Sequence, residues 1–225
     1  MGLKDKLFGK KNTETASAQN AGGAAQGNPG AGFCFAVADV FNLNNSADMV
    51  VVGYVFGRIN KGDAIYISNP GTDDSEVAIG IASDLMVCKT SVETAENTNV
   101  SIVIENGSKC LLKTGTVIHS REASLKDVHD AYVNALGDGY ISFRKLELGQ
   151  ADYDRMSVTD IVELFQLYLN YCKTNANDAS DKLVSRRNEI SNTFAKQICS
   201  KVLSSKEIYV LMSRRTGEPA MMSYT

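Results

Sequence analysis

Long apolar stretches are the first feature that the sequence lacks. No run approaches the roughly 18 consecutive apolar residues of a membrane-spanning helix. The first nine residues, Met1–Gly9, also hold no apolar run long enough for a signal peptide. These two absences predict a cytoplasmic chain without a transmembrane segment.

Paired cysteines are also missing. The chain has five cysteines, an odd number, and none forms a Cys-x-x-Cys pair: Cys34, Cys88, Cys110, Cys172 and Cys199. A disulfide framework or a zinc site needs paired spacing, so the pattern argues against both. We expect reduced thiols that act mostly as small core residues.

Neither sign of charge dominates. The 225 residues carry a formal net charge of −3, with 22% charged and 44% hydrophobic residues. This composition is ordinary for a folded, soluble chain, and the length suits one or two domains. A protein with this balance is not built as a whole to coat nucleic acid.

Residues 1–32 are expected to form a disordered tail and linker. From residue 11 onward the segment is mostly Asn, Thr, Ser, Ala, Gln and Gly, which cannot bury enough apolar surface to offset the entropy of ordering. Ahead of it, Leu3, Leu7 and Phe8 lie among four lysines. This patch is read either as a docking peptide for a membrane surface or partner, or as a frayed terminus. The short length favours the frayed terminus.

Residues 33–120 carry the period of β-strands. Phe35 and Val37 alternate with Ala36 and Ala38, and further short apolar runs follow, each bounded by Gly, Asn, Asp or Pro. Gly62 lies in a tight turn, where glycine tolerates a positive φ. Regular short strands of this kind predict a closed β-barrel or a sandwich. The further runs lie at 49–56, 64–68, 76–81, 100–105 and 116–119.

Five segments of this region share the order and pattern of one known fold. They are an Asp-bearing opening strand, a valine-rich strand broken by glycine, a Gly-x-Ile-x-x-Gly-Asp turn, an Asn-x-Asn-Val strand entry and a Gly-x-Val closing strand: Phe35–Phe41, Val50–Val55, Gly57–Asp63, Glu96–Ile104 and Leu112–Ile118. The region resembles the β-barrel second domain of translation GTPases such as elongation factor Tu. The resemblance implies six structural signature residues: Asp39, Gly53, Gly62, Asp63, Asn99 and Gly115.

The GTP-binding features of those relatives are absent from this sequence. It contains no Gly-x-x-x-x-Gly-Lys-Ser/Thr phosphate loop, and Asn44–Asp48 stands where the family has a Gly-Arg-Gly segment. Residues 33–120 hold ten acidic against five basic residues, a net charge of −5 that repels a phosphate backbone. We expect no GTP binding, no cofactor and no direct nucleic-acid binding by this region.

Residues 121–205 are predicted to be mainly helical. Ser124 caps a helix over 125–136, which Gly137–Gly139 ends, and residues 140–143 follow as a short strand or extended connector. Ser157, with Asp160 three positions on, caps a second helix through Cys172. A third helix is expected from about Ala179 to Leu203. The apolar stripes of the last two helices favour a core over a partner groove.

Residues 206–225 return to the period of strands. Glu207–Met212 and Ala220–Tyr224 predict a hairpin that either adds to another sheet or begins a further domain, because two strands alone are not stable. The hairpin faintly resembles the start of the SseB family, the enhanced-serine-sensitivity proteins. The expected fold class is a translation-factor-like β-barrel with a mainly helical C-terminal segment, α+β overall.

No catalytic or metal-binding constellation emerges from the residue pattern. His119 and His129 have neither a Gly-x-Ser-x-Gly elbow nor an obvious partner cysteine. Asp152 and Asp154 lack the Gly and Glu that a calcium loop requires, so they predict a polar turn. Turn residues are also expected at Asp73, Asp74, Arg214 and Arg215.

The sequence therefore indicates a non-catalytic binding or adaptor module with an unidentified protein partner. One alternative, implied by the resemblance alone, is a translation accessory protein that binds the ribosome or a translation factor. A second is an enzyme in the barrel–helix crevice, which needs one cavity that gathers a histidine with a carboxylate and a thiol. The oligomeric state stays open.

Overall fold

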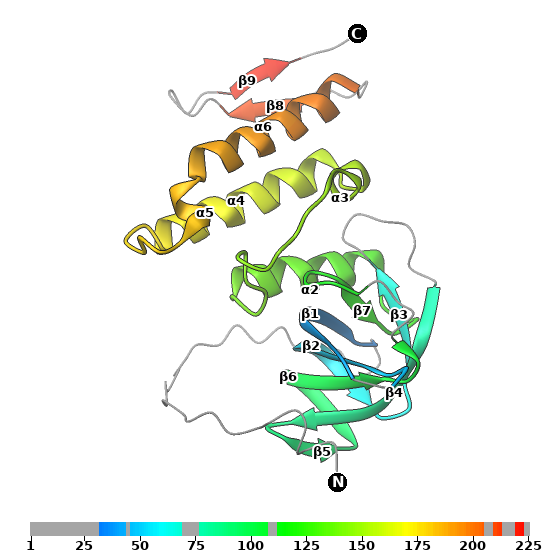
Figure 1. Ribbon diagram of the computed structural model, residues 1–225. Helices are drawn as coiled ribbons and strands as arrows, with labels where there is room; N and C mark the ends of the chain where they lie inside the picture. The colour runs from blue at the N-terminus through cyan, green and yellow to red at the C-terminus, as the bar shows by residue number, and fades with distance from the viewer. Residues whose placement is uncertain are drawn as a thin grey trace.

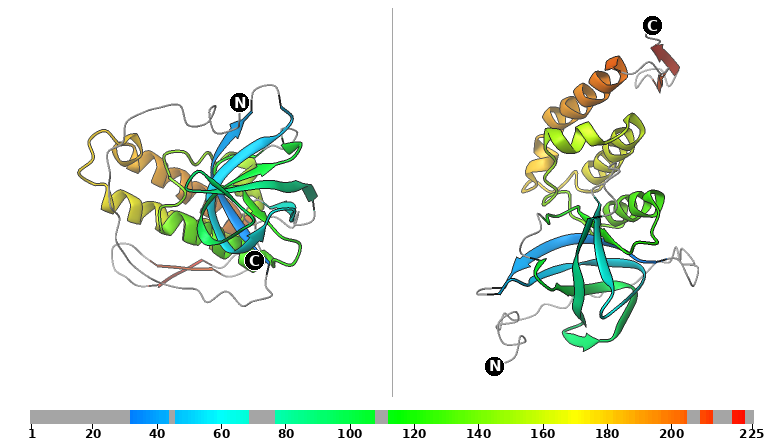
Figure 2. Two further views of the ribbon diagram at one scale, coloured as in Figure 1. Left: turned by 90° about the horizontal axis from the view of Figure 1, so that it is seen from below. Right: turned by 90° about the vertical axis from the view of Figure 1, so that its right-hand side faces the viewer.

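The computed structural model describes residues 32–43, 46–68, 77–107 and 112–204, with two further strands at 209–212 and 219–222. A seven-stranded antiparallel sheet lies at one end, and the helices stack on one side of it (Figures 1 and 2). The architecture is α+β. Among these residues, no helix combines the length and apolar character needed to cross a membrane.

Hydrogen-bonded pairings link the seven strands into a ring. The strand order is β3-β7-β1-β2-β6-β4-β5, and β3 also pairs with β4, so β5 alone extends from a closed circuit. The strands are β1 (Cys34–Asn42), β2 (Met49–Asn60), β3 (Ala64–Ser68), β4 (Val77–Val87), β5 (Thr90–Val92), β6 (Thr94–Ile104) and β7 (Val117–His119).

Strand alternation gives β1 two buried faces. Phe35 and Val37 belong to the core inside the ring, whereas Cys34 and Ala36 belong to a second core shared with the helices. Apolar side chains from β2, β3, β4, β6 and β7 complete the inner core: Val51, Val55, Ile59, Ile65, Leu85, Ile102, Ile104 and Ile118.

Capping boxes fix the starts of the two main predicted helices. In the first, the Asp127 backbone N–H donates to Ser124 Oγ at 3.2 Å, and the Ser124 N–H donates to the Asp127 carboxylate at 2.9 Å. Ser157 and Asp160 repeat the arrangement at 3.1 and 2.8 Å. The helices are α2 (Leu125–Gly137), α3 (Gln150–Arg155), α4 (Val158–Thr174), α5 (Lys182–Ser185) and α6 (Arg187–Ser204).

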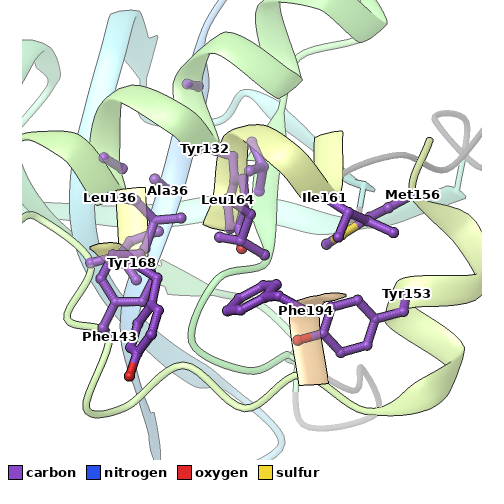
Figure 3. Packing of buried hydrophobic residues seen from close by; sticks show 14 of the residues in the cluster. Ala36, Tyr132, Leu136, Phe143, Tyr153, Met156, Ile161, Leu164, Tyr168 and Phe194 are labelled. Carbon is purple, nitrogen blue, oxygen red and sulfur yellow. The ribbon is translucent and has the colours of Figure 1, made fainter. Parts of the chain in front are cut away.

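The second core joins the outer face of the sheet to the helices. Cys34, Ala36 and Val117 from the strands pack with Val128, Ala131, Tyr132 and Ala135 of α2. Farther from the sheet, an aromatic group continues the same core between α3, α4 and α6 (Figure 3). There Phe194 lies 5.0 Å from Phe165 and 6.0 Å from Tyr153, measured between ring centroids.

Several elements match the sequence predictions. Strand β3 has the predicted bounds, and both predicted serine caps begin helices. Asp138 ends α2 within the predicted Gly137–Gly139 segment, and residues 140–143 form a connector without strand pairing. Strands β8 (Tyr209–Met212) and β9 (Pro219–Met222) pair antiparallel.

Several predicted elements are wrong in extent or type. Strand β2 runs on to Asn60 and β6 begins at Thr94, because the two strands pair over their whole length beyond the predicted runs. Strand β4 continues to Val87 and is followed by β5, because its second half pairs with β6 instead of ending in a loop. The third helix does not begin at Ala179 and is divided at Arg186 into α5 and α6. The predicted polar turn at Asp152 and Asp154 is helix α3, where Asp152 accepts the Gly149 N–H at 2.8 Å.

Some predictions concern residues outside the described part of the chain. They are the tail before Gly32, the thiol Cys110, and the turn residues Asp73, Asp74, Arg214 and Arg215. The division into domains at residues 32, 120 and 205 stays a prediction.

A buried carboxylate, that of Asp181, links the connector before α3 to helices α4 and α5. The Asp181 side chain is 1% exposed and accepts hydrogen bonds from Arg144 Nε at 3.1 Å, from the Leu183 N–H at 2.8 Å and from the Tyr171 hydroxyl. Burial raises the pKa of Asp181, but the hydrogen bonds outweigh it and hold the pKa below its usual value.

We predict that Asp181→Ala lowers the free energy of unfolding by about 2 kcal/mol at pH 7, because a helix cap is lost and buried donors lose their acceptor. Since the folded-state pKa is lowered, the stabilisation is present above the unfolded pKa of about 3.9 and is lost as pH falls through the folded pKa. Urea unfolding at pH 7 and pH 3 measures the difference.

Asp178→Ala is the matched control, because the Asp178 carboxylate contacts Arg144 at 2.6 Å from a solvent-exposed position. A smaller loss than that of Asp181→Ala is expected. Equal losses for the two variants, or an Asp181→Ala deficit that does not shrink in acid, would contradict the assignment.

Candidate functional site

A groove of about 240 Å³ opens between α2 and the outer face of β1, β2 and β6. We refer to it as the α2 groove. Its volume is below the roughly 300–1,000 Å³ of small-molecule pockets, so it suits a few side chains better than a cofactor. The lining residues are Gly32, Cys34, Phe56, Gly57, Asn97, Ala123, Asp127, Asp130, Ala131 and Asn134.

A break in strand register forms the floor of the α2 groove. The register between β2 and β6 shifts between Val55 and Arg58, and Gly57 there has a φ of +82°. A Cβ on Gly57 would lie 2.6 Å from the Gly32 carbonyl oxygen, so glycine is required for conformation and for space. Asn97, at φ +45°, accepts the Gly57 N–H through its side-chain oxygen at 2.9 Å.

Three aromatic rings stand beside this floor. Tyr54 stacks on Tyr140 with ring centroids 4.0 Å apart, and Phe56 lies 4.8 Å from Tyr54. The Tyr54 hydroxyl donates to the Asn97 carbonyl at 2.8 Å, which holds its ring against the strand. All three side chains are half-buried, so part of this aromatic surface is accessible.

The opposite wall is acidic. Asp127, Asp130 and Asn134 follow one another at helical spacing along α2 and line the groove, while Val128 and Ala135 pack into the second core. Hydrogen bonds from the Ser124 hydroxyl and N–H lower the pKa of Asp127, which is therefore ionised at neutral pH. Asp130 pairs with Lys126 one turn earlier on the exposed side of the helix.

Cys34 lies in the groove as a protonated thiol. It is 4% exposed, and burial, with added repulsion from Asp127 and Asp130, raises its pKa to about 12. A thiol is nucleophilic only as the thiolate, so Cys34 is inert at neutral pH.

Neither histidine lines the α2 groove. His119 is buried on β7, where its Nδ1 donates to the Ser120 carbonyl at 2.7 Å and its Nε2 accepts from Ser68 Oγ at 2.9 Å. His129 connects α2 to α4 through Glu163, with 3.0 Å between Nε2 and Oε2. The groove thus holds a thiol and carboxylates but not the histidine that the enzyme hypothesis requires.

The described residues contain no group of three or more His, Cys, Asp or Glu side chains placed to hold a metal ion. Asp152, considered above for calcium, instead pairs with Lys113 at 2.8 Å. These two residues flank a cavity of about 10 Å³, room for roughly one water, which Tyr132 also lines. The Tyr132 hydroxyl is buried without a protein partner.

The six signature residues implied by the resemblance lie on strands and turns of the ring and not in the α2 groove. Gly53 faces the Ala36 carbonyl oxygen, which lies 2.0 Å from where a Cβ would be, so a side chain at this position would clash with β1. Asp39 pairs with Lys145, and Asn99 is exposed on β6 opposite Tyr54.

The other three signature residues shape turns. Gly62 has a φ of +92°, and the Asp63 carboxylate accepts the Asn60 N–H at 2.7 Å, so the turn between β2 and β3 is fixed locally. Gly115 has a φ of +93° and donates its N–H to the Val37 carbonyl at 2.9 Å. None of the six lines the α2 groove.

No protein-family model matches the chain, and no curated protein matches it. Among solved structures, the comparison finds the GDP-bound crystal structure of aIF5B from Aeropyrum pernix, at 12% sequence identity and a TM-score of 0.32. The match covers 75% of this chain and 22% of that one, so the chain spans about a fifth of its length. A likeness this distant assigns no function.

We predict that Cys34 reacts with iodoacetamide at pH 8 at least about a hundredfold more slowly than Cys88, because its thiolate is scarce and shielded. Cys88 is exposed and serves as the internal reference within the same molecule. Peptide mass spectrometry over a labelling time course measures both rates. Equal rates would show that Cys34 is accessible and ionised, and would restore it as a candidate nucleophile.

Proposed function

We propose that this chain is a non-catalytic binding module whose α2 groove receives a basic, partly apolar segment of a protein. The observation that carries the proposal is the lining of the groove, which combines two carboxylates with the aromatic ring of Phe56 and contains no basic side chain. Within the proposal, the ring of strands is a barrel of the elongation-factor type that serves as a rigid platform for the groove.

The chemistry of the walls favours lysine or arginine next to an apolar residue. A cation above Phe56 gains a cation–π contact and lies in the same groove as Asp127 and Asp130. An apolar neighbour then covers the ring edges and Ala131 on α2. Nucleic acid fits poorly, because its phosphates would meet Asp127 and Asp130.

Resemblance to the second domain of translation GTPases supports a narrower version, in which the partner belongs to the ribosome or to a translation factor. Its sequence segments correspond to β1, β2, the turn at Gly62, β6 and β7, which are consecutive or adjacent in the ring. Co-sedimentation with ribosomal particles in a sucrose gradient at moderate salt tests this version. Protein that stays at the top of the gradient contradicts it and leaves the groove proposal intact.

Binding of a defined peptide tests the groove proposal directly. The probe is a fluorescein-labelled peptide of alternating lysine and leucine with one phenylalanine, titrated against the full chain by fluorescence anisotropy. We expect saturable binding with a dissociation constant below about 1 mM and a three- to tenfold loss in Asp130→Lys, since attraction becomes repulsion.

Glu93→Lys is the matched control, because it makes the same change in net charge at an exposed position outside the groove lining. Its affinity for the probe is expected to stay within about twofold of the unsubstituted chain. An equal loss in both variants would indicate attraction by overall charge and would refute a groove-specific site. Binding of the same peptide with glutamate in place of lysine would refute it as well.

A further inference from the structure

The beginning of the chain carries a cluster of positive charge. Residues 1–11, which we call the basic segment, contain four lysines and one aspartate, a net charge of +3. Because the whole chain carries −3, the remainder carries −6. The basic segment also contains Leu3, Leu7 and Phe8, so it combines cations with apolar side chains in the way that the walls of the α2 groove favour.

The described part of the chain begins at the groove itself. Gly32, the first described residue, is one of the lining residues, and its carbonyl oxygen is the atom closest to Gly57 in the floor. Twenty residues, 12–31, separate it from the basic segment, and from position 15 onward they are uncharged. A linker of this composition has a root-mean-square span of about 25 Å. The basic segment is therefore held within reach of the groove.

From these observations we infer that the basic segment of the same molecule occupies the α2 groove and competes there with the external partner. The inference rests on the proposed function, because it names the first occupant of the same site. Lysines of the segment face Asp127 and Asp130, and Leu7 or Phe8 covers the exposed part of Phe56 and Tyr54.

Cations of the segment do not have to displace a strong existing contact. The Lys126–Asp130 pair lies on the surface, with the lysine side chain 80% exposed, so exchanging one cation for another has little cost. The Asp127 carboxylate keeps its capping-box hydrogen bonds from Ser124 and still presents a negative charge to the groove.

Tethering makes even a weak contact effective. A short flexible linker gives an effective concentration on the order of 1 mM. If the segment alone binds with a dissociation constant of about 0.1 mM, it occupies the groove about 90% of the time. It then weakens an external ligand about tenfold. An external partner therefore has to compete with the basic segment for the α2 groove.

Two variants of the full chain test the inference, with the lysine–leucine–phenylalanine peptide as probe. One replaces Lys4, Lys6, Lys10 and Lys11 by Gln, which removes the cations without adding acidic side chains that attract the basic probe, and the other replaces Leu3, Leu7 and Phe8 by Ser without a change in charge. We expect both variants to bind the probe about tenfold more tightly than the unsubstituted chain. We also expect amide hydrogen exchange at the start of α2 to be faster in both variants than in the unsubstituted chain. In each chain, this exchange rate should not change across a tenfold range of protein concentration.

Different outcomes separate this inference from the proposed function. Equal probe affinity in all three chains overturns occupation by the segment and leaves the groove as a binding site. Failure of the probe to bind even the lysine variant overturns the proposed function itself. Hydrogen exchange in α2 that changes with protein concentration would assign the segment to the groove of a second copy and overturn the inference. Binding of the segment to anionic phosphatidylserine vesicles, with α2 exchange equal in all three chains, would assign it to a membrane surface and overturn the inference as well.

Discussion

Packing of α2 on the outer face of β1 is the contact on which the rest of the molecule depends. Because strand residues alternate, β1 contributes Phe35 and Val37 to the ring interior and Cys34 and Ala36 to the second core. The outward residues are small, so the helix can approach the sheet closely. Directly across the strand pairing, Phe56 lies opposite Cys34 and Tyr54 opposite Ala36. Large rings therefore stand where the neighbouring strand leaves space.

The groove follows from this arrangement and from one local irregularity. Val128, Ala131 and Ala135 fix the height of α2 above the sheet, and its next stripe, with Asp127 and Asp130, overhangs β2. The register shift at Gly57 turns the strand backbone just beneath that stripe. An uninterrupted β2 would present a further side chain there, and the Gly32 carbonyl leaves no room for one.

Local signals account for the elements that the sequence predicted well. The Ser-x-x-Asp pairs at Ser124 and Ser157 specify helix starts through neighbours three residues away, and alternation before and after Gly62 specifies β3. The groove depends instead on residues far apart in the chain. Gly57 and Asn97 meet only through the pairing of β2 with β6, and the pKa of Cys34 depends on carboxylates more than ninety positions later. No local sequence pattern indicates these contacts.

Helix α3 is not recognisable from the sequence, because its six residues are too few to show a helical period and its Asp152 cap resembles a turn residue.

Closure of the strand ring determines how any partner can make contact. In the seven-stranded sheet each strand has hydrogen-bonded neighbours on both sides except β5, which is three residues long and pairs with β4 alone. A free strand edge is what permits another chain to extend a sheet, in recognition as in aggregation. In this sheet, backbone without a second strand neighbour remains at β5 and along Thr94–Val100 of β6, which pairs with β4 only from Ser101 onward. Because the rest of the ring is already paired, recognition by the sheet depends mainly on side chains on its faces.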